Sequence, residues 1–225
     1  MPPAAPAVFT LKAVAFDLAE ESRSDTVGRV DDLEDYFQRL LNWEGQPATA
    51  LVAAWEDKFV QEIKENFRSA FERAAFRGKI LKVEEDISNQ AVGNRVAEFF
   101  TAAISPHLSA YRVEACSGPG YPDKKLIRRE GERVFVLELK ATSEFDAKDS
   151  NRIVLTSSSR KLRRDVRAPV NHLLATICYQ KDGVEIVLEH LRLDFLEPTT
   201  PVDMRLEGSV SRKALARAAH QNATF

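Results

Sequence analysis

The sequence predicts an α/β fold in which a mainly helical N-terminal region precedes a core of mixed strands and helices. Two observations predict it. Apolar side chains recur at helical spacing through much of the first 82 residues, whereas later segments alternate between the period of a strand and that of a helix. The 225 residues suit one large domain, or a domain with an appended helical part. We therefore expect an N-terminal region at residues 1–82 and a core at residues 83–225.

The N-terminal region is expected to contain two helices, at residues 31–43 and 48–77. The second is the more strongly patterned, because its apolar positions follow one helical stripe. These positions are Leu51, Val52, Trp55, Phe59, Ile63, Phe67, Ala70, Phe71 and Ala74. Gly78 is expected to end the helix. The stripe predicts a surface packed against the core or, alternatively, a dimer interface.

The core is expected to begin with a helix at residues 85–104, which Pro106 ends. Further helices are expected from Arg160, with Ser159 as the cap, and at residues 211–219. Strands are expected at residues 111–117, 124–129, 133–142, 153–156, 172–179 and 184–193. An Asp-Gly pair at residues 182–183 predicts a hairpin between the last two strands.

The most informative feature of the core is Pro122-Asp123, followed fifteen residues later by Glu138-Leu139-Lys140. A two-residue hairpin turn centred on Glu130-Gly131 would place Asp123 directly opposite Glu138 on neighbouring strands. Directly opposite side chains have Cβ atoms about 4.5–5.5 Å apart. Lys140 lies two residues further on and therefore faces the same side of the strand. Two carboxylates and one ammonium converging in this way are suited to a divalent metal ion and an activated water.

The second strand of this hairpin, residues 133–142, has two different faces. One is apolar throughout, at Phe135, Leu137, Leu139 and Ala141. The other begins apolar and becomes charged at its end, at Val134, Val136, Glu138, Lys140 and Thr142. This pattern predicts a strand that is buried on both sides in its first half and opens into a polar cleft. The alternative is a surface charge pair, with Asp123 merely starting a turn.

These residues resemble the motif of the PD-(D/E)XK nuclease superfamily, which includes most type II restriction endonucleases. Asp123 matches the Asp of the motif, Glu138 its acidic position and Lys140 its lysine. The resemblance implies a restriction-endonuclease-like mixed sheet flanked by helices, with Asp123 and Glu138 binding the metal. It also implies that the Leu139 carbonyl is a third ligand and that Glu98, on the preceding helix, is a fourth candidate and a third acidic group near the metal. Alternatively, Glu98 is a solvated acid paired with Arg95.

The expected metal is Mg²⁺, which takes oxygen ligands and usually only one or two carboxylates from a protein. Mg²⁺ can activate a water and neutralise charge on a phosphodiester. Lys140 would orient or help to deprotonate that water, or balance the phosphate charge. Glu114, on the strand before Asp123, is a weaker candidate for the same site.

The charge distribution permits DNA binding, although the net charge is −2. Residues 1–100 carry a net charge of −6, and residues 101–225 a net charge of +4. Local positive potential, rather than the average, decides whether a surface attracts phosphates. The expected DNA contacts are Lys124, Lys125, Arg160, Lys161, Arg163, Arg164 and Arg167. Alternatively, residues 160–167 form an ordinary solvated helix face.

The remaining features indicate a cytoplasmic protein. Cys116 and Cys178 lie far apart in strand-like segments and are expected to be reduced. We recognise no secretory signal, no membrane span and no zinc-like spacing of cysteine and histidine. No nucleotide cofactor is expected.

The leading hypothesis is a Mg²⁺-dependent endonuclease that cuts double-stranded DNA at a specific sequence, as type II restriction enzymes do. Cutting both strands of a palindromic site favours a homodimer. One alternative is a repair, recombination or phage nuclease of the same fold that recognises DNA structure. Others are a DNA-binding or assembly module without catalysis, and an unrelated α/β protein in which the motif is accidental.

Overall fold

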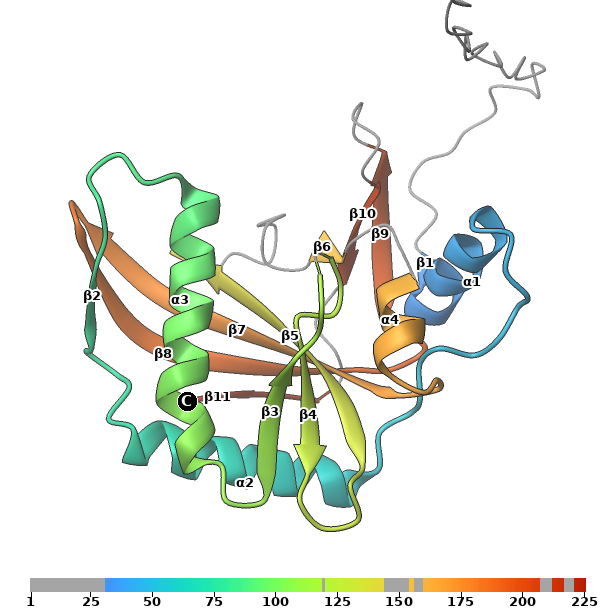
Figure 1. The fold of residues 1–225 in the computed structure, drawn as a ribbon, viewed down its shortest axis with the longest axis horizontal. Coiled ribbons are helices and arrows are strands. Elements are labelled where there is room, and N and C mark those ends of the chain that lie inside the picture. The colour runs from blue at the N-terminus through green and yellow to red at the C-terminus, as the bar shows by residue number, and fades with distance from the viewer. Residues whose placement is uncertain (1–30, 119, 144–153, 156–159, 207–211, 217–220) are drawn as a thin grey trace, which may run out of the picture.

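The computed structural model describes residues 31–118, 120–143, 154–155, 160–206, 212–216 and 221–225. The protein is a mixed α/β structure built on a curled seven-stranded sheet (Figure 1). Its strands are β2 (Ile80–Lys82), β3 (Tyr111–Ala115), β4 (Lys124–Arg128), β5 (Val134–Thr142), β7 (Asn171–Asp182), β8 (Glu185–Leu196) and β11 (Gln221–Thr224). Their order is β11-β8-β7-β5-β4-β3, and β2 also pairs with β8. Within this sheet β5 and β7 are parallel, and the other pairs are antiparallel.

A second, four-stranded sheet lies beside the first. It contains β1 (Asp31–Asp32), β6 (Val154–Leu155), β9 (Pro201–Leu206) and β10 (Arg212–Ala216), in the order β1-β9-β10-β6. All of its pairs are antiparallel.

Helices cover both faces of the large sheet. They are α1 (Leu33–Trp43), α2 (Asp57–Arg73), α3 (Asn89–Ile104), the 3₁₀ turn η1 (Ser105–His107) and α4 (Arg160–Asp165). Figure 1 shows α3 crossing one face and α2 running along one end of the sheet, with α1 and α4 grouped away from them. None of the helices in the described part of the chain is long and apolar enough to cross a membrane.

Strand β5 separates two hydrophobic clusters, as its sequence pattern predicts. Phe135, Leu137 and Leu139 pack with apolar residues of α2 and α3. Val136, on the opposite face, packs with apolar residues of α1 and α4. Because neighbouring side chains of a strand point to opposite faces, one strand is the shared centre of both clusters. Helix α2 thus packs into the same cluster as α3 and β5.

The β4–β5 hairpin has the predicted register but a longer loop. Lys124 pairs with Leu137 and Ile127 with Val134. Continued by one residue, this register places Asp123 opposite Glu138. The loop comprises residues 129–132, because Arg128 and Arg133 still pair through a 2.8 Å backbone hydrogen bond. Gly131 (φ 77°) and Glu132 (φ 52°) supply the left-handed backbone of this turn. The longer loop is centred on the same point as the expected turn, so the register is unchanged.

The long helix expected at residues 48–77 is wrong in its first part, because α2 begins only at Asp57. The preceding segment is extended and pairs with another part of the chain. Ala53 N–H donates to the Val170 carbonyl at 2.8 Å, and Val170 N–H to that of Leu51 at 3.2 Å. Glu34 on α1 accepts hydrogen bonds from the N–H groups of Leu51 and Val52. These tertiary contacts override the local helical pattern, as commonly happens.

The C-terminal helix expected at residues 211–219 is also wrong. Residues 212–216 form strand β10, which pairs with β9 from Arg212 opposite Leu206 to Ala216 opposite Val202. Other boundaries shift: α3 starts at Asn89 rather than residue 85, after Ser88 caps it by accepting from Ala91 N–H. Helix α2 ends at Arg73, before Gly78. The helix expected from Arg160 is confirmed, whereas its expected cap, Ser159, lies outside the described residues.

The carboxylate of Glu34 is expected to stabilise the fold by holding the extended segment before α2. We expect Glu34→Ala to lower the free energy of unfolding by about 1–3 kcal/mol, because two partly buried N–H groups lose their acceptor. Urea denaturation measures the change. Glu65→Ala, at an exposed glutamate of α2, is the matched control and is expected to change stability by less than about 0.5 kcal/mol. Equal effects of the two substitutions would contradict this role.

Candidate functional site

Asp123, Glu138 and Lys140 converge where β4 begins and β5 emerges from the core. The backbone N–H of Asp123 donates to Glu138 Oε2 at 3.1 Å, and that of Leu139 to Asp123 Oδ2 at 3.0 Å. Lys140 Nζ donates to Glu138 Oε1 at 2.5 Å. The Glu138 carboxylate is therefore held by the backbone of Asp123, the Asp123 carboxylate by the backbone of Leu139, and the Lys140 ammonium is bound to Glu138. The structure brings together the three residues of the motif.

Burial sets the protonation of this group. Glu138 is only 3% exposed, and its burial raises the pKa to about 7. The nearby Lys140 charge offsets part of that rise, while the charge of Asp123 adds to it. Burial disfavours the Lys140 ammonium, but the charge and hydrogen bond of Glu138 together with the charge of Asp123 outweigh this effect and leave the pKa of Lys140 raised. Two acids and one buried ammonium leave excess negative potential, which a further cation would relieve.

The group opens into a cleft of about 730 Å³. One wall is a stripe of α3 and the other walls come from β4, β5 and α4. The lining residues include Asn89, Gln90, Gly93, Asn94, Glu98, Cys116, Asp123, Lys124, Lys140, Thr142 and Lys161. The cleft is therefore polar, and the motif residues Asp123 and Lys140 face it directly.

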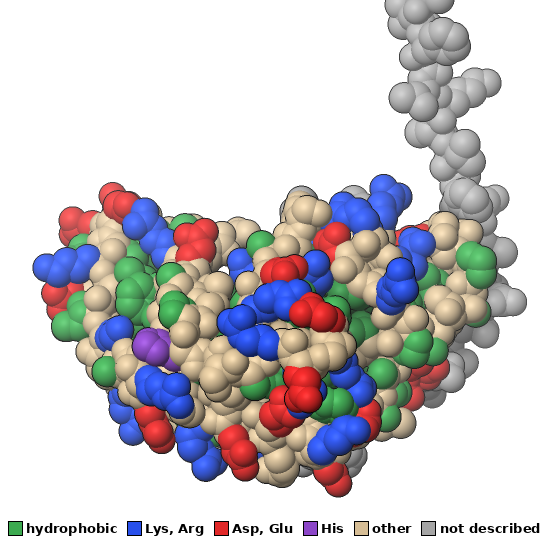
Figure 2. Space-filling view, turned by 60° about the horizontal axis from the view of Figure 1, so that its bottom comes forward, with side chains coloured by type: hydrophobic (Ala, Val, Ile, Leu, Met, Phe, Trp, Pro, Cys, Tyr) green, Lys and Arg blue, Asp and Glu red, His purple; other side chains and the backbone are tan. Residues whose placement is uncertain are grey.

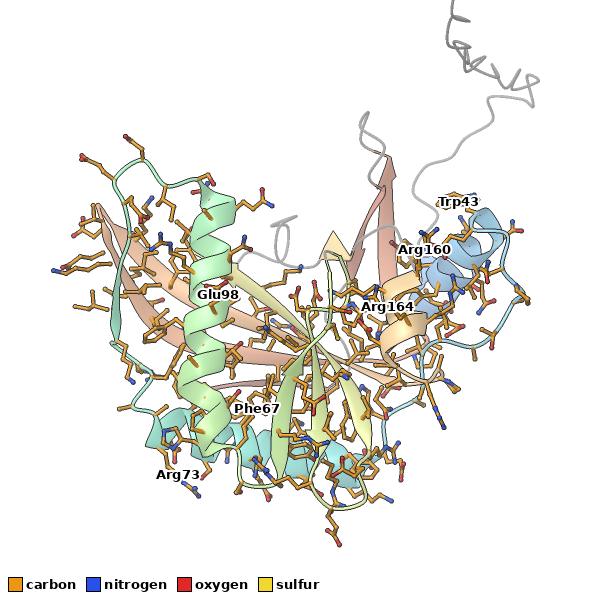
Figure 3. The ribbon with its side chains drawn as sticks, viewed as in Figure 1. Trp43, Phe67, Arg73, Glu98, Arg160 and Arg164 are labelled. Atoms are coloured by element: carbon orange, nitrogen blue, oxygen red, sulfur yellow. The ribbon has the colours of Figure 1, made fainter. Side chains whose placement is uncertain are left out.

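Glu98 lies on the α3 wall of this cleft and is exposed (Figure 3). Its expected alternative partner, Arg95, instead binds Glu84 at 2.6 Å. With the described residues Glu98 makes no hydrogen bond or ion pair of its own. The position thus agrees with an acid that faces the cleft, rather than with a helix acid neutralised by Arg95.

The oxygen atoms at this point suit a hard cation such as Mg²⁺. Within the described residues no group of three or more histidine, cysteine or acidic side chains forms a metal cluster. Mg²⁺, however, needs only one or two carboxylates and keeps several waters. Asp123 Oδ1 accepts no hydrogen bond from the described residues, so the carboxylate retains an open oxygen. In a strand the N–H and C=O of one residue point the same way, so the Leu139 carbonyl faces the side on which its N–H meets Asp123.

A buried hydrogen-bonded pair supports the segment that carries Asp123. Tyr121 and His172 are almost fully buried, and the Tyr121 hydroxyl contacts His172 Nδ1. The His172 Nε2 lies 3.2 Å from the Leu51 carbonyl, so Nε2 carries the proton and Tyr121 donates to Nδ1. Burial lowers the pKa of His172 to about 4 and keeps it neutral. No sequence motif identifies this pair, because His172 stands alone within an apolar strand.

The predicted DNA-binding residues are dispersed rather than gathered. Lys124 and Lys161 line the cleft, although Lys161 is buried and donates to the Gly120 carbonyl at 2.6 Å. Arg163 turns toward α1, where it binds Glu44 at 3.1 Å. Arg160 and Arg167 are exposed, and Arg160 lies on α4 with Arg164 (Figure 3).

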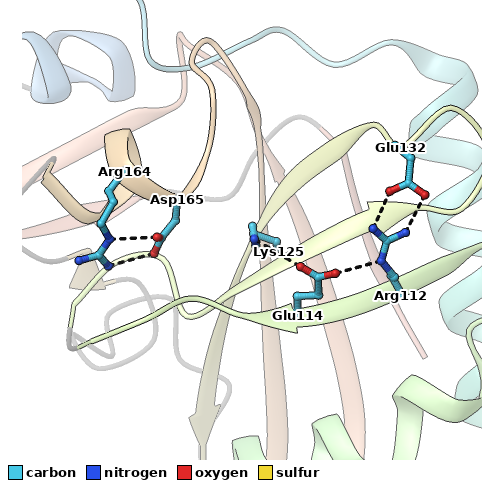
Figure 4. Close-up of polar contacts among 6 residues, drawn as sticks. All are labelled: Arg112, Glu114, Lys125, Glu132, Arg164 and Asp165. Atoms are coloured by element: carbon cyan, nitrogen blue, oxygen red, sulfur yellow. Dashed lines mark hydrogen bonds and ion pairs between the residues drawn. The ribbon is translucent and has the colours of Figure 1, made fainter.

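Carboxylates neutralise several of these cations (Figure 4). Arg164 pairs with Asp165 at 3.0 Å, and Lys125 with Glu114 at 3.4 Å. Glu114 also binds Arg112, so this weaker metal-site candidate belongs to an ion-pair chain along β3 and β4. Figure 2 shows basic and acidic side chains interspersed over the face that it presents. The cleft, rather than a broad basic patch, is therefore the candidate binding surface.

Comparisons with known proteins add no family to this picture. The sequence matches no protein-family model, and a search of curated proteins finds no significant match.

The raised pKa of Glu138 predicts that the stability of the folded protein falls as the pH rises. Between pH 4.5 and about 7 the unfolded chain releases the Glu138 proton while the folded protein retains it, so rising pH lowers stability. A shift of this size corresponds to roughly 3 kcal/mol. In EDTA, we expect the wild type to lose more unfolding free energy than Glu138→Gln between pH 5 and pH 8. Urea titrations measure both, with exposed Glu65→Gln as the control. Parallel pH profiles for the wild type and Glu138→Gln would contradict the assignment.

Proposed function

We propose that this protein is a Mg²⁺-dependent endonuclease of the PD-(D/E)XK type that hydrolyses double-stranded DNA. The observation that carries the proposal is the convergence of Asp123, Glu138 and Lys140 at the mouth of a polar cleft. An accidental motif on a surface strand would not bury Glu138 or hold the two carboxylates on the backbone N–H groups of Asp123 and Leu139. The type II, sequence-specific mode of action and the homodimer belong to the proposal.

The arrangement of elements supports the same proposal. Helix α3 is followed by three antiparallel strands, β3, β4 and β5, then by the short β6 of the second sheet, by α4 and by β7, which is parallel to β5. This is a mixed sheet flanked by helices, as the resemblance implies. The ends of β4 and β5 that carry the site open between α3 and α4, where the cleft lies.

Each residue of the site has a distinct proposed role. Asp123, Glu138 and the Leu139 carbonyl would hold Mg²⁺. When bound, Mg²⁺ lowers the pKa of a coordinated water and neutralises charge on the phosphodiester. The raised pKa of Lys140 favours a charged side chain that orients the water or balances the phosphate, over one that accepts a proton. Glu98, across the cleft, is a further acid that could orient a water. Lys124 and Lys161 would face the DNA backbone.

The catalytic assignment predicts that Asp123→Ala and Lys140→Ala each reduce cleavage at least about 100-fold, since each removes a group that contacts metal, water or phosphate. Both variants are expected to retain DNA binding. The assay incubates protein with unmethylated phage and plasmid DNA in Mg²⁺ or in EDTA. Asp182→Ala and Lys181→Ala are matched controls, because both side chains are exposed and lie at the far end of β7. Cleavage at the wild-type rate by either site variant would refute the assignment.

The same assay separates the alternatives. Discrete fragments that require Mg²⁺ support a sequence-specific endonuclease, whereas a smear or degradation from ends favours a nuclease that recognises DNA structure. If no duplex, branched or single-stranded DNA is cut, a non-catalytic DNA-binding module becomes the better interpretation. Metal binding has an independent readout: Mg²⁺ is expected to raise the melting temperature of the wild type and not that of Asp123→Ala.

A further inference from the structure

The α3 wall of the cleft contains a helical glycine that the fold itself does not require. Gly93 lies in the interior of α3, where glycine is the least favourable residue apart from proline. Its backbone is helical, so no left-handed conformation demands glycine. A Cβ built at Gly93 would meet nothing within 4 Å, so close packing does not demand it either. Glycine also allows a ligand to approach the backbone closely, and Gly93 faces the cleft.

Two amide side chains flank this glycine on the same wall. Gln90 and Asn94 line the cleft, are exposed, and make no hydrogen bond with the described residues. They are four residues apart, and Glu98 follows after four more, so the three side chains share one helical stripe. The opposite face of α3, with Val92, Val96 and Phe100, is buried in the core. The buried face thus fixes α3 on the core, while the polar groups of the amide stripe remain unengaged by the described residues.

The walls of the cleft differ in charge. Its lysines are Lys124, Lys140 and Lys161, which come from β4, β5 and α4. The α3 wall presents neutral amides and one acid, Glu98, without a lining cation. Phosphates are attracted to the lysines, whereas amides can both donate and accept and so suit the edges of bases. A DNA strand in the cleft would therefore have its backbone toward β4, β5 and α4 and its bases toward α3.

We propose that the stripe of Gln90, Gly93 and Asn94 is the surface of this protein that reads base edges in double-stranded DNA. The inference rests on the proposed function and extends it to specificity. Gly93 allows the nucleic acid to lie against the helix backbone, and Asn94 and Gln90 hydrogen-bond to bases at increasing distance from Glu98. Their Cα atoms rise about 6 Å and about 12 Å along the helix from Glu98, so Asn94 reads closer to the cut than Gln90.

Substitutions of Gly93 separate DNA binding from folding, because a side chain at this position is expected to stabilise the helix but to weaken DNA binding. Gly93→Ala is expected to raise the melting temperature by about 2–4 °C, since alanine favours the helix. Gly93→Leu is expected to keep the fold and to weaken binding at least about tenfold, because its side chain fills the cleft. Fluorescence anisotropy with a duplex carrying the mapped cleavage site, in the Asp123→Ala background, measures binding without cleavage. Equal affinity of the wild-type and Gly93→Leu proteins would overturn the proposal.

The amides are tested by the cleavage pattern on phage DNA. Asn94→Ala and Gln90→Ala are expected to add cleavage sites that differ from the original at defined bases, closer to the cut for Asn94. A single bidentate contact to a base is worth about 5- to 150-fold in discrimination. Gln61→Ala, at an exposed glutamine of α2 outside the cleft, is the matched control and is expected to leave the pattern unchanged.

The outcomes distinguish this inference from the proposed function. If the wild type neither binds nor cuts DNA, the proposed function is wrong and the inference with it. If the wild type cuts but both amide variants keep its pattern, the inference alone is wrong. A uniform loss of affinity with an unchanged pattern would also overturn it, because that result indicates phosphate rather than base contacts.

Discussion

The two-sided burial of β5 is the constraint on which the rest of the structure depends. One face of this strand holds Phe135, Leu137 and Leu139 against α2 and α3, and the other holds Val136 against α1 and α4. A slip of one residue would exchange the faces and place Glu138 and Lys140 in the cluster of α2 and α3. The same packing that builds the core therefore fixes which way the two charged side chains point, and β4 and β7 hold the strand from either side.

Folding the candidate site costs free energy because it buries the charge of Glu138, and hydrogen bonds from neighbouring groups offset part of that cost. Burial opposes the charge of Glu138, so the carboxylate needs the Asp123 N–H and the Lys140 ammonium as partners. The segment before Asp123 is anchored by Tyr121 and His172, whose hydrogen bonds are complete within the core. A buried, hydrogen-bonded support next to two carboxylates with only one neighbouring ammonium is the arrangement expected where a bound cation would complete the site.

The hairpin and its site could be predicted from the sequence because local rules determine them. The two-residue period of β5 and the position of one turn are sufficient to place Asp123 opposite Glu138. The segment before α2 could not be predicted in the same way. Leu51 and Val52 follow the helical pattern, but they are held extended by the distant Val170 and by the side chain of Glu34. Likewise, β10 is a strand because β9 pairs with it, a contact that its own residues do not reveal.

The ion pair of Arg163 could not be predicted from the sequence either, because its partner, Glu44, lies on another part of the fold. The run from Arg160 to Arg167 predicts a positive surface, but the structure pairs Arg163 with Glu44 and Arg164 with Asp165. Such pairs weaken the long-range field of each cation, so a count of basic residues overstates the attraction for DNA. The lysines that line the cleft come from separate elements and are brought together only by the fold. Under the proposed function, a chain with a net charge of −2 would bind DNA through the lysines that line the cleft. Because these lysines would contact only a few phosphates, the affinity for DNA should fall only moderately with rising salt.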